Sequence, residues 1–159
     1  MSEEQAHTPP PLLSLTGDQA RDLLLVERLW SETMRAGPRI NGWPIRFDGT
    51  PGPFGIPNAC WHMASKDVRG GGREYNVMRA RRVAWACWMF ANPNVDCITT
   101  WLAIERRRRR LYLWMQEYDY VLVLEERAEA GCYYVVTAYA VEGKSSVRKL
   151  QTSLCNRIE

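Results

Sequence analysis

The chain has two histidines, and one of them lies in the stretch ACWHMASK, residues 59–66. Pro57 and Asn58 precede this stretch and predict a short helix or turn, on which His62 and Lys66, four residues apart, share one face. A fixed cation beside an imidazole disfavours the charged ring, which stays neutral near pH 7 and able to accept a proton. His62 is therefore a candidate proton-transfer group, and the alternative is a buried ring with a structural role.

A second pair of polar side chains lies near the C-terminus, in the strand-like stretch CYYVVTAYAV. Side chains alternate across a strand, so Tyr133, Val135, Thr137 and Tyr139 are predicted to share one face. The hydroxyls of Thr137 and Tyr139 would then lie side by side, as a candidate functional pair. Threonine and tyrosine are also common strand residues, so the pattern equally fits a sheet surface with no chemical role.

Basic residues are concentrated in parts of the chain, although the net charge is only +3. They gather between Lys66 and Arg82, in the run Arg106–Arg110, and at Lys144, Arg148 and Lys149, while acidic residues collect between residues 117 and 129. Such clustering predicts a basic surface, which suits a polyanionic partner. For the run Arg106–Arg110, a solvated turn between two strands is the alternative.

Helical patterns precede strand patterns along the chain. The stretch QARDLLLVERLWSETMRA predicts a helix capped by Thr16 or Asp18, and REYNVMRARRVAWACWMFAN predicts another. Residues 38–57 predict a long loop with an extended piece at residues 45–47. Four segments rich in β-branched and aromatic residues then predict an antiparallel meander: CITTWLAI, RLYLWMQ, DYVLVLEER and CYYVVTAYAV.

This order of elements predicts an α+β fold, with N-terminal helices packed on a C-terminal four-stranded antiparallel meander sheet. Residues 1–16, which contain three consecutive prolines, are expected to form a disordered or extended tail. Residues 17–150 form a single domain, and residues 151–159 a C-terminal tail or final helical turn. A chain of 159 residues is long enough to build one core.

Composition limits the setting in which the protein works. No apolar run approaches the ~20 residues that span a bilayer, and the acidic start Met-Ser-Glu-Glu does not resemble a signal peptide, so a cytoplasmic location is expected. The five cysteines are widely spaced and fit neither a disulfide framework nor a zinc motif. Cys60 and His62 lack further ligands at standard spacing, so no metal or cofactor is expected.

Taken together, these features resemble the phage-associated branch of the barnase/EndoU/colicin/RelE-like nucleases. The resemblance covers roughly residues 60–150 and includes His62 before an arginine-bearing helix, the meander with YLWMQEYDYVLVLEER, and the Thr-x-Tyr of VVTAYAVEG. It departs from the family in the long loop DVRGGGREYN and in the lack of a second histidine within the domain. His7 falls in the predicted tail, which argues against a two-histidine mechanism.

The resemblance implies metal-independent cleavage of RNA, in which the 2′-hydroxyl attacks the adjacent phosphate and leaves a cyclic phosphate. It implies that His62 is the base or acid and that Lys66 and Arg79, the latter preferred over Arg82, hold the phosphate and stabilise the transition state. Thr137 and Tyr139 would donate hydrogen bonds, with Tyr139 a possible acid. Trp61 is expected to stack on a base, and Arg69 and Arg82 to bind substrate.

Two other classes of function fit the same residues. One is a nucleic-acid-binding protein without cleavage activity, and the other is a phage protein-interaction or inhibitor module that uses the aromatic and arginine-rich sheet surface. An active ribonuclease would also imply a protective partner, and an acidic inhibitor covering the basic cleft is the expected form.

Overall fold

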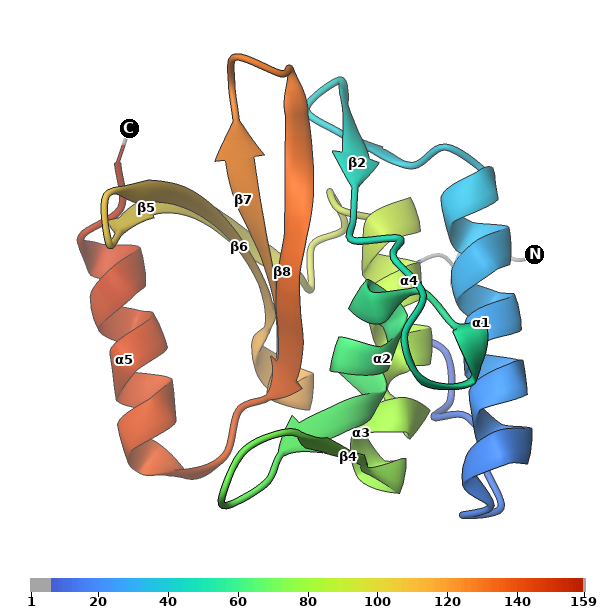
Figure 1. Ribbon diagram of the computed structural model, residues 1–159. Helices are drawn as coiled ribbons and strands as arrows, with labels where there is room; N and C mark the ends of the chain where they lie inside the picture. The colour runs from blue at the N-terminus through green and yellow to red at the C-terminus, as the bar shows by residue number, and fades with distance from the viewer. Residues whose placement is uncertain (1–6, 159) are drawn as a thin grey trace.

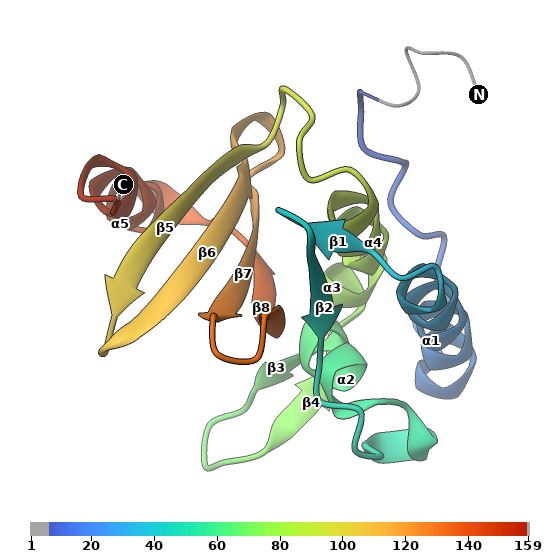
Figure 2. The ribbon, with the colours of Figure 1, turned by 90° about the horizontal axis from the view of Figure 1, so that it is seen from above.

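The computed structural model describes residues 7–158 and has an α+β architecture (Figure 1). A curled sheet lies in the middle, helices α1–α4 cover one face, and helix α5 covers the other (Figures 1 and 2). The helices are α1 (Gln19–Arg35), α2 (Asn58–Ala64), α3 (Val77–Arg81), α4 (Val83–Ala91) and α5 (Gly143–Cys155), with short 3-10 turns at Pro53–Gly55 and Gln116–Tyr118.

The sheet has six strands within residues 7–158, in the spatial order β1-β2-β8-β7-β6-β5. Its strands are β1 (Arg39–Ile40), β2 (Trp43–Arg46), β5 (Thr99–Glu105), β6 (Arg108–Met115), β7 (Tyr120–Arg127) and β8 (Cys132–Ala140). Strands β5 to β8 form an antiparallel meander, whereas β2 runs parallel to β8. A separate hairpin consists of β3 (Ser65–Asp67) and β4 (Arg73–Tyr75).

The α+β class and the four predicted strands are present, but the predicted four-stranded sheet is wrong. The short strands β1 and β2 extend it on the β8 side, where the extended piece expected at residues 45–47 becomes a paired strand. The predicted helix over residues 73–92 is also divided, because β4 occupies its start and the chain bends at Arg82 between α3 and α4.

Two hydrophobic cores lie on opposite faces of the sheet. The larger core lies under α1 to α4, and Leu23, Val26 and Trp30 of α1 are buried in it. Helix α4 is apolar on nearly all sides because it lies between α1 and the sheet (Figure 1). The smaller core lies between the sheet and α5, and it buries Trp101, Tyr112 and Trp114.

Helix α5 matches the helical one of the two expectations for the C-terminus and extends it. Residues 151–155 belong to this helix rather than to a tail, because Leu150, Val147 and Leu154 pack against the smaller core. Helix α5 therefore covers the aromatic part of the sheet surface that the interaction-module hypothesis required to be exposed. None of the helices formed by residues 7–158 combines the length and apolar character needed to cross a membrane.

The predicted tail over residues 1–16 also differs from the structure where the structure describes it, from residue 7 onward. Leu13 and Leu15 pack against the larger core, and the carbonyl of Pro10 accepts a hydrogen bond of 2.8 Å from Trp85 Nε1. The main-chain N–H of Leu13 donates to the carbonyl of Arg81. Residues 1–6 lie outside the described part of the chain.

A buried carboxylate joins this segment to the helical layer. Asp22 accepts hydrogen bonds from the Thr16 main chain (2.8 Å), the Thr16 hydroxyl (2.9 Å), the Gly17 main chain (2.8 Å) and the Tyr75 hydroxyl (2.6 Å). Burial acts to raise the pKa of Asp22, but the hydrogen bonds from Tyr75, Thr16 and Gly17 outweigh it and lower the pKa below its usual value. The ionised form is thus the form that stabilises the fold.

We predict that Asp22→Asn lowers the free energy of unfolding by about 3 kcal/mol at pH 7, because an amide cannot accept all four hydrogen bonds and one donor stays buried without a partner. Since the pKa of Asp22 is depressed in the folded state, its stabilisation is present above about pH 4 and is lost as the pH falls further. Urea denaturation of both proteins should show the difference shrinking at low pH.

Asp18→Asn is the matched control. Asp18 is exposed and caps α1 by accepting from Arg21 N at 3.0 Å, and asparagine caps a helix about as well. Equal destabilisation by the two substitutions would contradict the special role of Asp22.

Candidate active site

The candidate site lies along an edge of β8 that β2 covers only in part. Strand β2 pairs with β8 at Tyr133 and Tyr134, and no other strand formed by residues 7–158 pairs with this edge farther along. Helix α2 lies beside the uncovered part (Figure 1). The edge carries main-chain groups that need hydrogen-bonding partners, and side chains from α2 and α3 approach it.

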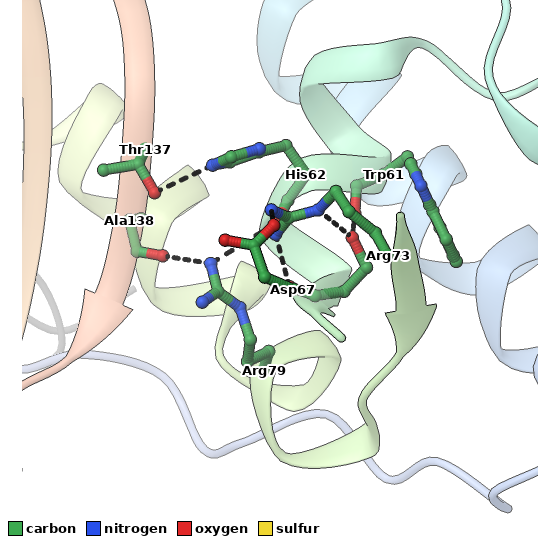
Figure 3. Close-up of polar contacts among 8 residues, drawn as sticks. Trp61, His62, Asp67, Arg73, Arg79, Thr137 and Ala138 are labelled. Carbon is green, nitrogen blue, oxygen red and sulfur yellow. Dashed lines mark hydrogen bonds and ion pairs between the residues drawn. The ribbon is translucent and has the colours of Figure 1, made fainter. Parts of the chain in front are cut away.

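His62 and Thr137, which the resemblance placed in one site, lie next to each other here. His62 Nε2 lies 3.2 Å from Thr137 Oγ1, within hydrogen-bonding distance, and the imidazole is half-buried (Figure 3). This contact joins α2 to β8 and fixes the direction of the ring. Either group can be the donor, depending on the tautomer of the imidazole.

A β-bulge in β8 interrupts the face predicted for Tyr133, Val135, Thr137 and Tyr139, although Thr137 and Tyr139 both follow the bulge and keep their regular alternation. Thr137 pairs with Val123 and Val135 pairs with Leu124, which leaves Val136 without an opposite residue. Alternation is interrupted at this point. As a result Val135 contacts the larger core, whereas Tyr139 contacts the smaller core under α5.

Two arginines hold the main chain around His62. Arg73 donates to the carbonyls of His62 (2.9 Å) and Ser65 (2.7 Å), to the Ser65 hydroxyl (2.8 Å) and to Asp67 (2.8 Å). Arg79 donates to the carbonyls of His62 (3.3 Å) and Ala138 (3.0 Å) (Figure 3). Arg79 therefore ties α3 to both α2 and the edge of β8.

These contacts set the protonation of His62. Burial of the ring lowers the pKa of His62 below its usual value, and the charges of Arg73 and Arg79 lower it further, while Asp67 opposes them. The imidazole is accordingly neutral near pH 7. Neighbouring cations do lower the pKa of His62, as predicted, but these cations are Arg73 and Arg79.

Lys66 is not the cation beside His62. Helix α2 ends at Ala64, so residues 65–67 form β3 and the four-residue spacing no longer places Lys66 on the face of His62. The Lys66 ammonium instead lies 3.7 Å from Glu74 across the hairpin, with both side chains exposed.

A surface hollow of ≈ 340 Å³ opens beside His62. It combines a neutral imidazole with guanidinium groups, carboxylates and an aromatic ring. Its lining comprises Asp48, Asn58, Ala59, His62, Arg110, Glu125, Arg127, Tyr134, Val135 and Val136. Such a set can bind an anion and accept a proton next to it.

Glu125 organises the arginines of this hollow. Its side chain is only 12% exposed, and Arg108 (2.9 Å), Arg127 (3.1 Å) and Arg110 (4.0 Å) lie against it. Burial acts to raise the pKa of Glu125, but hydrogen bonds from Arg127 and Arg108 outweigh it and lower the pKa, so the carboxylate stays ionised. Arg127 also lies over the ring of Tyr134, 3.9 Å from its centre.

The run Arg106–Arg110 forms the turn between β5 and β6 and the first residues of β6. This agrees with the interpretation of the run as a turn between two strands. Arg106 and Arg107 have left-handed φ angles of 50° and 65° in a two-residue turn between β5 and β6. Arg109 pairs with Glu126 at 3.0 Å. The acidic residues of β7 thus neutralise part of the run.

Four predicted residues gather at a second hollow. Lys66, Arg79, Arg82 and Tyr139 line a space of ≈ 370 Å³ at the other end of the uncovered β8 edge. Burial raises the pKa of Tyr139, and the charge of Glu105 raises it further. Tyr139 therefore holds its proton strongly, and it lines a different hollow from His62.

Two predicted substrate-binding residues lie elsewhere. Trp61 is 7% exposed and packs in the larger core, and its ring points away from Thr137 (Figure 3), so it cannot stack on a base. Arg69 is exposed in the turn between β3 and β4, outside both hollows. Sequence reasoning missed Arg73, Arg110, Glu125 and Arg127, although acidic residues facing an arginine run across a hairpin were a usable signal for the last three.

No group of three or more His, Cys, Asp or Glu side chains that could hold a metal ion occurs among residues 7–158. Burial raises the pKa of Cys60, so the thiol of this residue, two positions before His62 in the sequence, stays protonated.

Comparisons with protein-family models, with curated proteins and with solved structures found no match for this chain.

We predict that the imidazole of His62 titrates below about 6.5 and that Arg73→Gln raises its pKa, because one of the two cations that disfavour the imidazolium is removed. Lys66→Met should leave the pKa unchanged. An NMR titration of the ring protons, assigned with His62→Gln, measures all three values. A shift in Lys66→Met without one in Arg73→Gln would contradict the assignment.

Proposed function

We propose that the protein is a metal-independent endoribonuclease whose reaction takes place at the His62 hollow. The observation that carries the proposal is a neutral imidazole, fixed by Thr137, in one hollow with the guanidinium groups of Arg110 and Arg127. The resemblance of its sequence to the barnase/EndoU/colicin/RelE-like nucleases favours the same reaction class.

His62 would act as the general base. Its neutral ring takes the proton of a 2′-hydroxyl, the 2′-oxygen forms a bond to the adjacent phosphorus, and the bond from phosphorus to the 5′-oxygen breaks. The leaving oxygen takes a proton from water, which reaches the hollow past the exposed side chains of Asn58 and Arg127. The products are a 2′,3′-cyclic phosphate and a free 5′-hydroxyl.

Arg110 and Arg127 would stabilise the charge that develops on the phosphorane. Arg110 Nη1 lies 4.0 Å from Glu125, beyond hydrogen-bonding distance, so this end of the guanidinium has bonding capacity left for an incoming phosphate. Glu125 is a positioning residue, since it holds the arginines toward the hollow. Lys66 and Tyr139 take no part in this step, in contrast to the roles that the resemblance implied.

RNA binding without cleavage is the second candidate, and one observation favours it. The two cations closest to His62, Arg73 and Arg79, donate to main-chain carbonyls, which is a structural use of these side chains.

An acidic inhibitor remains the proposed protective partner of an active enzyme, and the exposed arginines of the β5–β6 hairpin are the surface it would contact.

We expect cleavage of end-labelled RNA at pH 7 in excess chelator, with a cyclic phosphate on the product. His62→Gln should reduce the single-turnover rate by at least ~100-fold, because the general base is removed. Since the neutral ring is the active form, the rate should fall with decreasing pH only below about 6.5. Denaturing gel electrophoresis and mass spectrometry identify the products.

His7→Gln is the matched control for loss of an imidazole, and Arg28→Gln on α1 is the control for loss of a surface cation. Both should cleave at the wild-type rate, whereas Arg110→Gln should be slowed at least about tenfold. If the RNA stays intact but binds with a steep salt dependence, the nuclease proposal is wrong and the protein is an RNA-binding protein without cleavage activity. Equal rates for His62→Gln and His7→Gln would remove His62 from the reaction.

A further inference from the structure

The second hollow has its own set of ligand-binding groups. It lies between α3, the β3–β4 hairpin and the end of β8, and its volume of ≈ 370 Å³ falls in the range of small-molecule sites. Lys66, Arg79 and Arg82 bring three positive charges to it from two different segments. Glu142 is the acidic residue in its lining.

Two cations of this hollow, Arg82 and Lys66, keep free hydrogen-bonding capacity. Arg82 donates one hydrogen bond, to the carbonyl of Met78 at 2.9 Å, and lies over the ring of Trp85. The contact of Lys66 with Glu74 is long and exposed, and such pairs contribute little. Arg79 donates to the carbonyls of His62 and Ala138, so it contributes mainly its charge to the hollow. A bound anion would accept from Arg82 and Lys66.

The rest of the lining is largely apolar. Met78 contributes exposed carbon and sulfur surface, whereas Met63, Tyr120 and Ala138 lie buried in the wall of the hollow. Methionine side chains adapt to flat aromatic groups and make favourable contacts with them. The hollow therefore suits a ligand with an anionic part and a flat apolar part.

We propose that this hollow binds a nucleotide, with its phosphate held by Arg82 and Lys66 and its base against Met78. A phosphate presents three acceptor oxygens and about two negative charges, which matches converging cations better than a carboxylate does. The hollow adjoins the His62 site through Arg79, which bonds both His62 and Ala138. The choice of a nucleotide rests on the proposed ribonuclease function, whereas the binding itself does not require cleavage.

The test is an NMR titration of the full chain with uridine 5′-monophosphate at low ionic strength, following the amide signals of Asn76 and Ala140, which line the hollow. We expect the monophosphate to shift these signals and uridine to bind at least about tenfold more weakly. Arg82→Gln and Lys66→Met should each lower the affinity for the monophosphate several-fold. His62→Gln should leave this affinity unchanged.

Arg109→Gln, in the β5–β6 hairpin, is the matched control for loss of one positive charge. Weakening by Arg109→Gln equal to that by Arg82→Gln would overturn the proposal, as would uridine binding as tightly as its monophosphate. A 2′-deoxy oligonucleotide that competes for the same signals would identify phosphates of a strand as the source, and lack of competition would identify a free nucleotide. Because no variant is read through cleavage, failure of the nuclease proposal leaves this result intact.

Discussion

The arrangement of the candidate site depends on the incomplete cover of β8. Strand β2 is short and pairs with β8 at Tyr133 and Tyr134 only, so the following main-chain groups on that side must find other partners. Arg79 supplies one by donating to the carbonyl of Ala138, and His62 contacts the side chain of the preceding residue, Thr137. Helices α2 and α3 are thus docked against a sheet edge by polar side chains, which places an imidazole at a defined point on the surface.

The electrostatics of His62 follow from this docking. Arg73 closes the junction between α2 and the β3–β4 hairpin by donating to two carbonyls, a hydroxyl and a carboxylate, and Arg79 joins α3 to the edge of β8. Both guanidinium groups lie near the ring because they bond the carbonyl of His62 itself. The low pKa of His62 is therefore a consequence first of burial of the ring and then of the arginines that satisfy its main chain.

Local patterns in the sequence were sufficient for part of this description. A cap of α1 at Thr16 or Asp18 and the four strands of the meander were predictable from propensity and residue type, whereas a shared site for His62 and Thr137 followed only from the resemblance. The position of Lys66 was not predictable. The local composition does not indicate whether the helix ends at Ala64 or continues to Lys66. The bulge at Val136 was equally hidden, since one unpaired residue reverses the side-chain alternation without changing the β propensity of the segment.

Charge balance distinguishes the two hollows on either side of the Thr137–Ala138 stretch. In the His62 hollow, Glu125 already binds the arginines and holds their charge partly neutralised. A ground-state phosphate gains little there, whereas the larger charge of a phosphorane can compete better with the carboxylate, and only such differential stabilisation accelerates a reaction. In the second hollow, Lys66, Arg79 and Arg82 face Glu142 alone among the lining residues. That imbalance is consistent with the proposed binding of a stable anion there, whereas the paired charges of the His62 hollow are consistent with the proposed reaction.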